Sequence, residues 1–580
     1  MIKRFSSVVR EYKKYALMTP LFVSGEVILE VLIPLIMGKL LDDGVDAGSL
    51  DNIWKYGLLL LGCSFLSLFF GAMAGRTAAI ASTGFGKNLR HDMYYAVQNY
   101  SFTNIDRFTA SSLVTRMTTD VTRIQNAFQM LIRMAVRSPL MLIFSTVMAF
   151  KIHPTLPLIY VACLPVLGAG LYVIASKAHP IFEKVLKRYD SLNGVVSENV
   201  RGMRVVKSFV REDYENKKFT DVSDDIYSDF SRAEKTIAYN MPLMQLCMYI
   251  CVLVISWFGA RIIVTSGNSP DGLTTGELTS LLSYVMSILM SLMMVSMFFV
   301  MITISRAAGE RVIEVLDEKS DIVDGEKNLT EVKDGSVKFE NVTFKYHGAD
   351  DICLKDINLD IHSGETIGII GGTGTGKSTL VQMIPRLYDV TEGAVKVGGE
   401  DVRDYNVEAL RDAVAMVLQK NVLFSGTIAD NLRWGNPNAT QEELEHVCRL
   451  AQAHDFIMSF PDGYETHIEQ GGTNVSGGQK QRLCIARALL KKPKILILDD
   501  STSAVDTHTD ALIREAFRKY IPDTTKFIIA QRAASVADAD RIIVLDGGRV
   551  VDIGTNDELM GRCDIYREVC ESQMKGGELE

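Results

Sequence analysis

An apolar run, Thr366–Ile370, leads directly into Gly371-Gly372-Thr373-Gly374-Thr375-Gly376-Lys377-Ser378, and a helical pattern follows from Thr379. Strand, glycine-rich loop and helix in this order form a P-loop, in which backbone N–H groups surround phosphate groups. The N-terminus of the helix favours their negative charge. Lys377 is expected to reach the β- and γ-phosphates of ATP, and the Ser378 hydroxyl to ligate Mg²⁺. The stretch therefore predicts an α/β domain that binds ATP and Mg²⁺.

A second apolar run supplies the acidic residue that such a site requires. Ile495–Leu498 is predicted to be a buried strand, and it ends at Asp499, from where a carboxylate holds Mg²⁺. An Asp at a strand end is common by itself, and the upstream P-loop is what gives Asp499 this role. From Val337 onward short β-rich runs, glycine turns and helical stretches alternate, as is typical of an α/β domain. We place this domain at residues 336–575.

The N-terminal half contains six apolar stretches, each long enough to cross a bilayer, which takes about 20 residues. They lie at about 16–40, 54–80, 134–152, 155–176, 240–265 and 277–304. We therefore assign residues 1–304 to a membrane domain and residues 305–335 to a polar linker.

Charges in the loops predict the orientation of the spans. The segments between spans two and three and between spans four and five are rich in Lys and Arg, whereas the loop after span one is acidic. The positive-inside rule places both termini and both long segments in the cytosol. Both segments are amphipathic and have few helix breakers, so the spans are expected to continue as helices beyond the membrane. Turns near Phe102–Thr109 and Phe209–Asp213 are expected to touch the ATP-binding domain.

Composition excludes several other classes of protein. A net charge of −9 argues against a nucleic-acid-binding protein, which usually carries a basic face. The nine cysteines are scattered and form no CxxC pair, so neither a zinc site nor a disulfide framework is indicated.

Two features within the spans are candidates for a substrate path. Glu26 and Glu30 lie four residues apart, on one face of a helix, and ionisable groups inside a membrane usually face a polar cavity. The alternative is that both lie near the outer mouth, solvated or paired for structural reasons. In span six a methionine stripe offers a flexible surface for varied apolar ligands, although packing or lipid contact also explains it. The stripe consists of Met286, Met290, Met293, Met297 and Met301.

Between the P-loop and Asp499 lies Val475-Ser476-Gly477-Gly478-Gln479, which is similar to the signature sequence of ATP-binding cassette (ABC) proteins. With six spans ahead of one such domain, nearly the whole chain resembles an ABC exporter half-transporter. The resemblance implies an all-α six-helix membrane domain of the type IV exporter fold with long cytosolic extensions. That domain is fused to an α/β P-loop nucleotide-binding domain.

The resemblance also implies roles for single residues. Tyr346 stacks on adenine, Gln419 contacts Mg²⁺ together with Ser378 and Asp499, and Ser503-Ala504-Val505-Asp506 is the D-loop. The family pattern further implies a dimer with a second half-transporter and two ATP molecules. Each ATP lies between the P-loop of one chain and the signature of the other, here Ser476, Gly477, Gly478 and Gln479.

Three positions depart from the family pattern. The glutamate that normally follows the Walker-B aspartate and positions the attacking water is Asp500, and the switch histidine is Gln531. Ahead of the signature, where exporters often carry an acid–Arg–Gly run, the chain reads Gln470-Gly471-Gly472, which puts coupling through that loop in doubt. Aspartate withdraws its carboxylate by about an ångström, a displacement that can cost about a hundredfold in rate. We expect the chain to bind ATP but to hydrolyse it poorly at its own P-loop.

This asymmetry resembles the bacterial heterodimeric multidrug exporters, in which one ATP site is degenerate. It implies a partner with Glu and His at the two positions, an inner-membrane location, contact with lipid, and a small amphipathic or hydrophobic substrate. A lipid flippase, a peptide exporter half, and an ATP-gated channel or sensor subunit are the alternatives.

Overall fold

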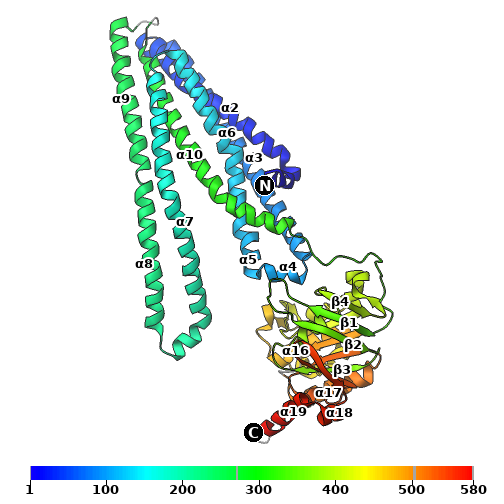
Figure 1. Ribbon diagram of the computed structural model, residues 1–580. Coiled ribbons are helices and arrows are strands. Elements are labelled where there is room, and N and C mark those ends of the chain that lie inside the picture. The colour runs from blue at the N-terminus through cyan, green and yellow to red at the C-terminus, as the bar shows by residue number, and fades with distance from the viewer. Residues whose placement is uncertain (1, 269–271, 501–504, 578–580) are drawn as a thin grey trace. The chain divides into compact units, whose positions relative to one another are not determined.

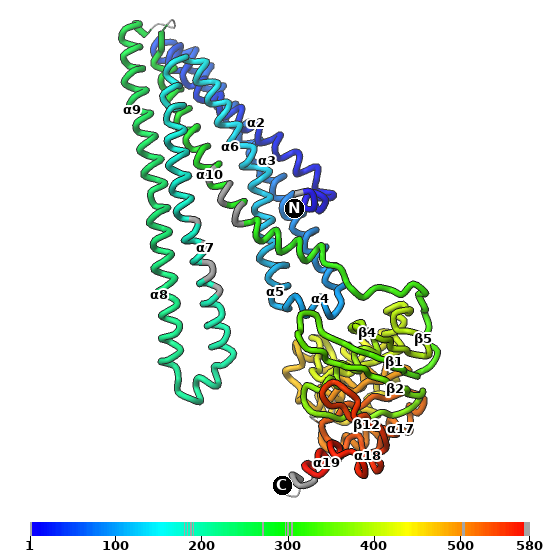
Figure 2. Tube along the Cα trace, viewed as in Figure 1, coloured from blue at the N-terminus to red at the C-terminus, as the bar shows by residue number. Residues whose placement is uncertain are grey.

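The chain forms two compact units (Figure 1). The computed structural model describes residues 2–268, 272–500 and 505–577. One unit contains Met1–Gln98 and Ser111–Asp317, and the other contains Asn99–Ala110 and Glu318–Glu580. The short segment Asn99–Ala110 lies in the helical half of the sequence but packs with the α/β half. Figure 2 traces the chain from α3 (Leu50–Gln98) through α4 (Phe102–Arg107) into α5 (Ala110–Thr115).

The first unit is all-helical. Its elements besides α3 and α5 are α1 (Ile2–Val8), a 3₁₀ turn (Arg10–Tyr12), α2 (Lys13–Lys39), a π-helical segment (Leu40–Asp46), a second π-helical segment (Arg116–Asp120), α6 (Val121–Ile152), α7 (Leu158–Ser208), α8 (Glu212–Ile237), α9 (Asn240–Ser266) and α10 (Thr275–Asp317). In the described part of the chain, six helical stretches are long and apolar enough to cross a membrane, which confirms the six predicted spans. The helices α3 and α7 run far past the apolar stretches, and α8 is an additional polar helix ahead of α9. The short helix α4 occupies the first predicted turn, and a turn at Phe209–Val210 forms the second.

The helix α10 does not end where the predicted linker begins. It continues through Asp317, so the first part of the predicted linker is helical and packs with the helical unit. The loss of apolar residues marks where the chain leaves lipid, and ion pairs then stabilise the helix in water. Arg306 pairs with Glu310 at 2.9 Å along α10, and Arg311 Nη2 lies 2.6 Å from Asp120 Oδ1.

Close packing at small residues joins α2 to α10. A Cβ on Gly276 would lie 2.0 Å from the Gly38 carbonyl oxygen, so only glycine allows this approach. One turn further, Ser280 Oγ donates to the Pro34 carbonyl at 2.7 Å. Buried side chains of α2, α6, α7, α9 and α10 form the core of this unit.

The second unit is built on two sheets. The antiparallel sheet has the order β2 (Leu354–Ile361), β1 (Val337–Phe344), β4 (Glu392–Val397) and β5 (Glu400–Asp401). The larger sheet has the order β12 (Arg549–Gly554), β11 (Arg541–Asp546), β3 (Thr366–Gly371), β10 (Thr525–Ile529), β9 (Ile495–Asp499) and β6 (Val414–Val417). All of its strands are parallel except β12. A small ribbon pairs β7 (Gly426–Thr427) with β8 (His467–Ile468). The helices besides α4 are α11 (Lys377–Gln382), α12 (Val407–Ala413), α13 (Ile428–Arg433), α14 (Gln441–Leu450), α15 (His454–Met458), α16 (Gly477–Leu490), α17 (Thr507–Tyr520), α18 (Asn556–Arg562) and α19 (Asp564–Gly577).

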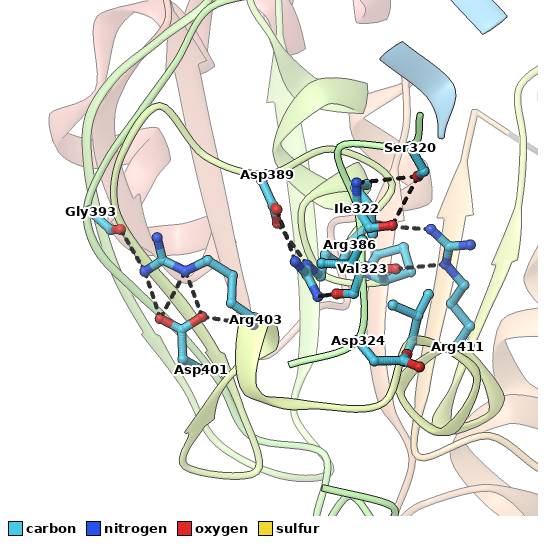
Figure 3. A network of polar contacts seen from close by, with 12 residues as sticks. Ser320, Ile322, Val323, Asp324, Arg386, Asp389, Gly393, Asp401, Arg403 and Arg411 are labelled. Atoms are coloured by element: carbon cyan, nitrogen blue, oxygen red, sulfur yellow. Dashed lines mark hydrogen bonds and ion pairs between the residues drawn. The ribbon is translucent and has the colours of Figure 1, made fainter. Parts of the chain in front are cut away.

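Residues after α10 are held on the α/β unit by polar contacts (Figure 3). Arg386, which is 4% exposed, donates from Nη1 to the Val323 carbonyl at 2.8 Å and from Nε to Asp389 Oδ1 at 2.8 Å. Asp324 Oδ1 accepts from the Val407 N–H at 3.0 Å, at the start of α12. The second half of the predicted linker is therefore an integral part of this unit.

Candidate functional site

Four parallel strands bring the predicted site residues to one edge of the larger sheet. Because β3, β10, β9 and β6 run in the same direction, their carboxyl ends meet at that edge. The P-loop follows β3, Gln531 follows β10, Asp499 ends β9 and Gln419 follows β6. Ligands bind at this edge in open α/β sheets.

The P-loop takes a conformation that depends on glycine. Gly374 and Gly376 have φ values of 81° and 92°, in the left-handed region that other residues rarely adopt. A Cβ on Gly376 would also lie 2.8 Å from Leu354 Cδ2. The turn lets α11 begin at Lys377, whose Nζ donates to the carbonyls of Gly371 and Gly372 at 2.9 and 2.6 Å. Gly372, Thr373 and Gly374 are exposed, so the loop backbone is open to a phosphate chain.

Ser378 and Asp499 form an oxygen pair that suits a magnesium ion. Ser378 Oγ donates to Asp499 Oδ1 at 2.8 Å, and Asp499 is 3% exposed. Burial raises the pKa of Asp499 and the Asp500 charge adds to this, while Ser378 and Lys377 oppose it. Burial lowers the pKa of Lys377 against the attraction of both carboxylates. A hydroxyl and a carboxylate are the hard oxygen ligands that Mg²⁺ prefers, so these residues fit the ion.

The two unusual residues are joined to each other. Gln531 Nε2 donates to Asp500 Oδ2 at 2.7 Å, and Gln419 Nε2 lies 3.5 Å from the same oxygen. Asp500 has a φ of 47° and donates its N–H to the Ile529 carbonyl at 3.0 Å, which fixes it beside β10. The Gln531 carbonyl in turn accepts from Gln573 of α19 at 2.7 Å. Neither the Gln531–Asp500 bond nor the Gln573 brace carries a signal in the sequence.

The predicted adenine-side residue, Tyr346, lies against α11. Its hydroxyl lies 2.9 Å from Thr379 Oγ1, and burial raises its pKa although the Thr379 hydrogen bond opposes this. The Tyr346 ring centroid lies 4.8 Å from that of Phe344 and 5.3 Å from that of Tyr388, both edge-on.

The signature residues form a separate feature at the start of α16. Ser476 caps the helix, with its Oγ accepting from the Gln479 N–H at 3.3 Å and its N–H donating to Gln479 Oε1 at 2.9 Å. Ser476 and Gly477 are exposed, so the positive end of a 14-residue helix faces outward. The D-loop residues Ser503 and Ala504 lie outside the described residues, and Asp506 caps α17 by accepting from the Thr509 N–H at 2.9 Å.

Comparison with known proteins agrees with this geometry. The ABC transporter transmembrane region matches residues 17–293, and the ABC transporter domain matches residues 354–503. The chain is 34% identical to the uncharacterized ABC transporter ATP-binding protein YfiB of Bacillus subtilis, over 98% of each chain. The chain belongs to the ABC transporter family.

Two further relatives extend the comparison. The multidrug efflux ATP-binding/permease protein Rv0194 of Mycobacterium tuberculosis is 32% identical over 93% of this chain and 45% of its own length. A solved structure of a bacterial Atm1-family ABC exporter with ATP bound aligns over 98% of this chain and 99% of that one, with a TM-score of 0.83 and 23% identity. That likeness shows the fold, which is the type IV exporter fold expected from the sequence. One chain carries a membrane domain and an ATP-binding domain, so this ABC transporter chain is a half-transporter.

The compact unit that contains the ABC domain also includes α4, in the stretch Phe102–Thr109 where sequence reasoning expected a turn. Tyr388 donates its hydroxyl to Asp106 Oδ2 at 2.7 Å, and its ring lies 5.9 Å from that of Phe102. Burial, together with the Asp106 hydrogen bond, raises the pKa of Tyr388. Directly after α10, within the predicted linker, Glu318 accepts from Asn104 Nδ2 at 2.7 Å. The contact of α4 with the ABC domain is thus present, and Tyr388, which the sequence gave no reason to select, mediates it.

The two candidates for a substrate path, the glutamates of α2 and the methionine stripe of α10, differ in their surroundings. Glu26 and Glu30 of α2 both pair with Arg137 of α6, a partner that sequence reasoning missed. Both carboxylates are therefore paired. Four methionines of the α10 stripe are exposed on this chain: Met286, Met290, Met293 and Met297. The fifth, Met301, is half-buried.

Proposed function

We propose that this ABC transporter chain is one subunit of a heterodimeric, ATP-driven exporter of amphipathic or hydrophobic compounds. Its own P-loop site binds ATP with Mg²⁺ but hydrolyses it slowly. The observation that carries this proposal is the 2.7 Å hydrogen bond from Gln531 to Asp500.

The groups that bind nucleotide are complete. Lys377 supplies a positive charge beside the P-loop amides, and Tyr346 supplies an aromatic ring near α11. Ser378 and Asp499 would hold the magnesium ion, which neutralises charge on the phosphate oxygens when bound. Affinity for ATP therefore depends on residues that follow the family pattern.

The groups that promote hydrolysis are altered together. Asp500 is one methylene shorter than the usual glutamate, and its Oδ2 is engaged by the Gln531 amide. A carboxylate displaced by about 1 Å loses about a hundredfold in rate, and an oxygen that already accepts from the Gln531 amide has one acceptor position fewer for the attacking water. The Gln531 amide can donate a hydrogen bond but cannot accept and return a proton as imidazole does.

The signature supports an asymmetric dimer. The exposed N-terminus of α16, with its serine and glycine residues in place, can receive the phosphates of an ATP bound to another chain. A partner with Glu and His at the positions of Asp500 and Gln531 would thus have a competent site. Hydrolysis there would reset the transporter, while ATP at this chain's site favours the closed ABC domains.

The transport role rests on the membrane unit and on relatives. Proteins of similar length and architecture are named multidrug exporters, such as the putative multidrug export protein YgaD of Bacillus subtilis. The exposed α10 methionines provide the adaptable apolar surface that varied substrates require. We place the chain in the bacterial cytoplasmic membrane with both termini in the cytosol, because the basic segments lie between spans two and three and between spans four and five.

Steady-state ATPase activity tests the proposal. The chain is purified alone, with the half-transporter encoded beside it, and with that partner's catalytic glutamate changed to glutamine. Low activity alone, high activity of the pair and its collapse in the variant pair would support one slow and one competent site. The Lys377→Ala variant of this chain sets the background. High activity of the chain alone would refute the heterodimer proposal.

A further inference from the structure

Within the membrane unit, one arginine bridges two glutamates. Arg137 of α6 donates from Nη2 to both carboxylate oxygens of Glu30, at 2.8 and 2.9 Å, and from Nη1 to Glu26 Oε1. The side chain of Glu26 is 9% exposed, whereas those of Glu30 and Arg137 are 27% and 24% exposed. Glu26 is therefore the buried end of the cluster, and Glu30 and Arg137 are its accessible end.

The cluster lies at the depth of the hydrocarbon core. Arg137 precedes the last residue of α6, Ile152, by about four turns, or about 22 Å at 1.5 Å per residue. The hydrocarbon core is about 30 Å thick, so the predicted spans place Arg137 inside it near the start of the third span, and Glu26 and Glu30 near the middle of the first. A buried ion pair seldom stabilises a protein more than apolar packing does, and charges at this depth are costly. Stability alone does not explain why the transporter has them.

The charges do not balance. Two carboxylates face one guanidinium, and Glu26 Oε2 is buried without a hydrogen-bond partner among the described residues. The next cation along α6, Arg133, forms no ion pair with either glutamate in the described part of the chain, and its buried Nε also lacks a hydrogen-bond partner there. The cluster thus retains acceptor capacity for one more positive group.

Aromatic rings adjoin the carboxylates. The centroid of Phe70 lies 6.2 Å from that of Phe22 and 5.8 Å from that of Phe69. The helices α2 and α3 pack closely here at two glycines. A Cβ on Gly25 would lie 3.1 Å from the Phe70 ring, and a Cβ on Gly71 would lie 3.1 Å from Glu26 Oε1. Phe69 is exposed and Phe22 and Phe70 are half-buried, so an apolar surface continues from the charged cluster. Rings beside carboxylates recognise organic cations through apolar and cation–π contact.

We propose that Glu26 and Glu30 bind the positive group of a singly charged amphipathic substrate, whose apolar body lies on Phe22, Phe69 and Phe70. Arg137 is the resident counter-ion, which balances one of the two carboxylate charges and competes with the substrate cation for both carboxylates. This inference rests on the proposed export function and narrows it to organic cations. It also gives the costly buried charges a role. A cationic substrate loses its hydrating water when it enters the apolar unit, and the carboxylates replace that water as partners of its positive group.

Binding of matched probes tests this site. The full-length chain in lipid nanodiscs, without nucleotide, is titrated with tetraphenylphosphonium, with the anion tetraphenylborate and with neutral triphenylphosphine oxide. We expect tetraphenylphosphonium to bind and tetraphenylborate not to bind at the same site. Glu26→Gln or Glu30→Gln should weaken cation binding about tenfold, the size typical of losing one close charge pair, and leave the neutral probe within about twofold.

The decisive variant is Arg137→Gln. It removes the competing cation, so tetraphenylphosphonium should bind about tenfold more tightly, a gain that misfolding cannot produce. Asp120→Asn, which breaks a buried carboxylate–arginine pair of the same unit outside the membrane, is the matched control and should leave cation affinity unchanged. Unchanged or weaker cation binding by Arg137→Gln, or full binding by Glu26→Gln/Glu30→Gln, would overturn the inference. The binding assay contains no ATP, so its failure would not affect the proposal of one slow and one competent ATP site. Failure of the ATPase assay would likewise leave a measured cation site unaffected.

Discussion

Asp500 and Gln531 stand where the family has Glu and His, and the hydrogen bond between them predicts that their effects on ATP hydrolysis depend on each other. Replacing them singly and together with the family residues gives three variants: Asp500→Glu, Gln531→His and the double variant. In the first, Gln531 still donates to the longer carboxylate. In the second, the carboxylate loses the Gln531 hydrogen bond but remains too short. Each single variant should therefore gain little, and the double variant should gain more than the product of the two.

The structure sets the size of this coupling. A 2.7 Å hydrogen bond from a neutral amide to a carboxylate contributes about 1.5–3 kcal/mol. Each 1.36 kcal/mol corresponds to a factor of ten, so the double variant should exceed the product of the single gains by about 10- to 150-fold.

The assay is ATP turnover by the complex in which the partner's catalytic glutamate is changed to glutamine, so that only this chain's site is measured. Gln573→Ala serves as the matched control, because it removes the brace on the Gln531 backbone without changing a group that faces the nucleotide. Losing this neutral hydrogen bond, together with the one that Gln573 Oε1 accepts from the Ala533 N–H at 2.8 Å, should change the rate by no more than about fivefold. Single and double gains that multiply to within about twofold would show independent residues and refute the reasoning.

Three further predictions concern the ABC domain. Tyr388→Phe should weaken the attachment of α4, because its hydroxyl donates to Asp106. A double-variant cycle with Asp106→Asn, measured by hydrogen exchange in α4, should give an interaction energy of about 1.5–3 kcal/mol. An interaction energy near zero would contradict this. Burial tends to raise the pKa of Glu365, but hydrogen bonds from Arg541 and from the His362 N–H hold it below its ordinary value. The stabilisation from Glu365 is therefore fully present above the ordinary glutamate pKa and is lost as the pH falls through the lowered pKa of Glu365. The urea midpoints of the wild type and of Glu365→Gln should converge as the pH falls, and a constant difference between the two midpoints would contradict this prediction. Ser378→Ala should leave the affinity for metal-free ATP within about threefold and weaken Mg²⁺–ATP binding by about tenfold or more, as measured with a fluorescent nucleotide, because one hard oxygen ligand is lost.

The ATP site could be predicted from the sequence because its residues follow strand ends. Thr366–Ile370 and Ile495–Leu498 are apolar runs that end in a glycine loop and a carboxylate, and parallel strands must bring these ends together. The sequence also predicted the six spans, because each stretch is apolar over a membrane thickness.

The remaining features depend on contacts between distant segments. Gln531 meets Asp500 only because β10 lies between β3 and β9, a strand order that local patterns do not contain. Arg137 lies at the start of a predicted span and shows no sequence spacing to Glu26, so their ion pair follows only from the packing of α2 against α6. The continuation of α10 beyond the sixth predicted span was not predicted, because it relies on ion pairs rather than on apolar residues.

Binding and hydrolysis use different parts of this ATP site, which explains how one can be lost without the other. The segment Arg386–Asp389, just after α11, holds the residues that follow α10 through Arg386 and holds α4 through Tyr388. Tyr388 also contacts Tyr346, so these attachments adjoin the adenine side of the site. Asp500 and Gln531 belong instead to the ends of β9 and β10. A chain altered only at those two residues keeps the contacts of Tyr388 with Tyr346 and with α4, so in the proposed function it would lose hydrolysis alone.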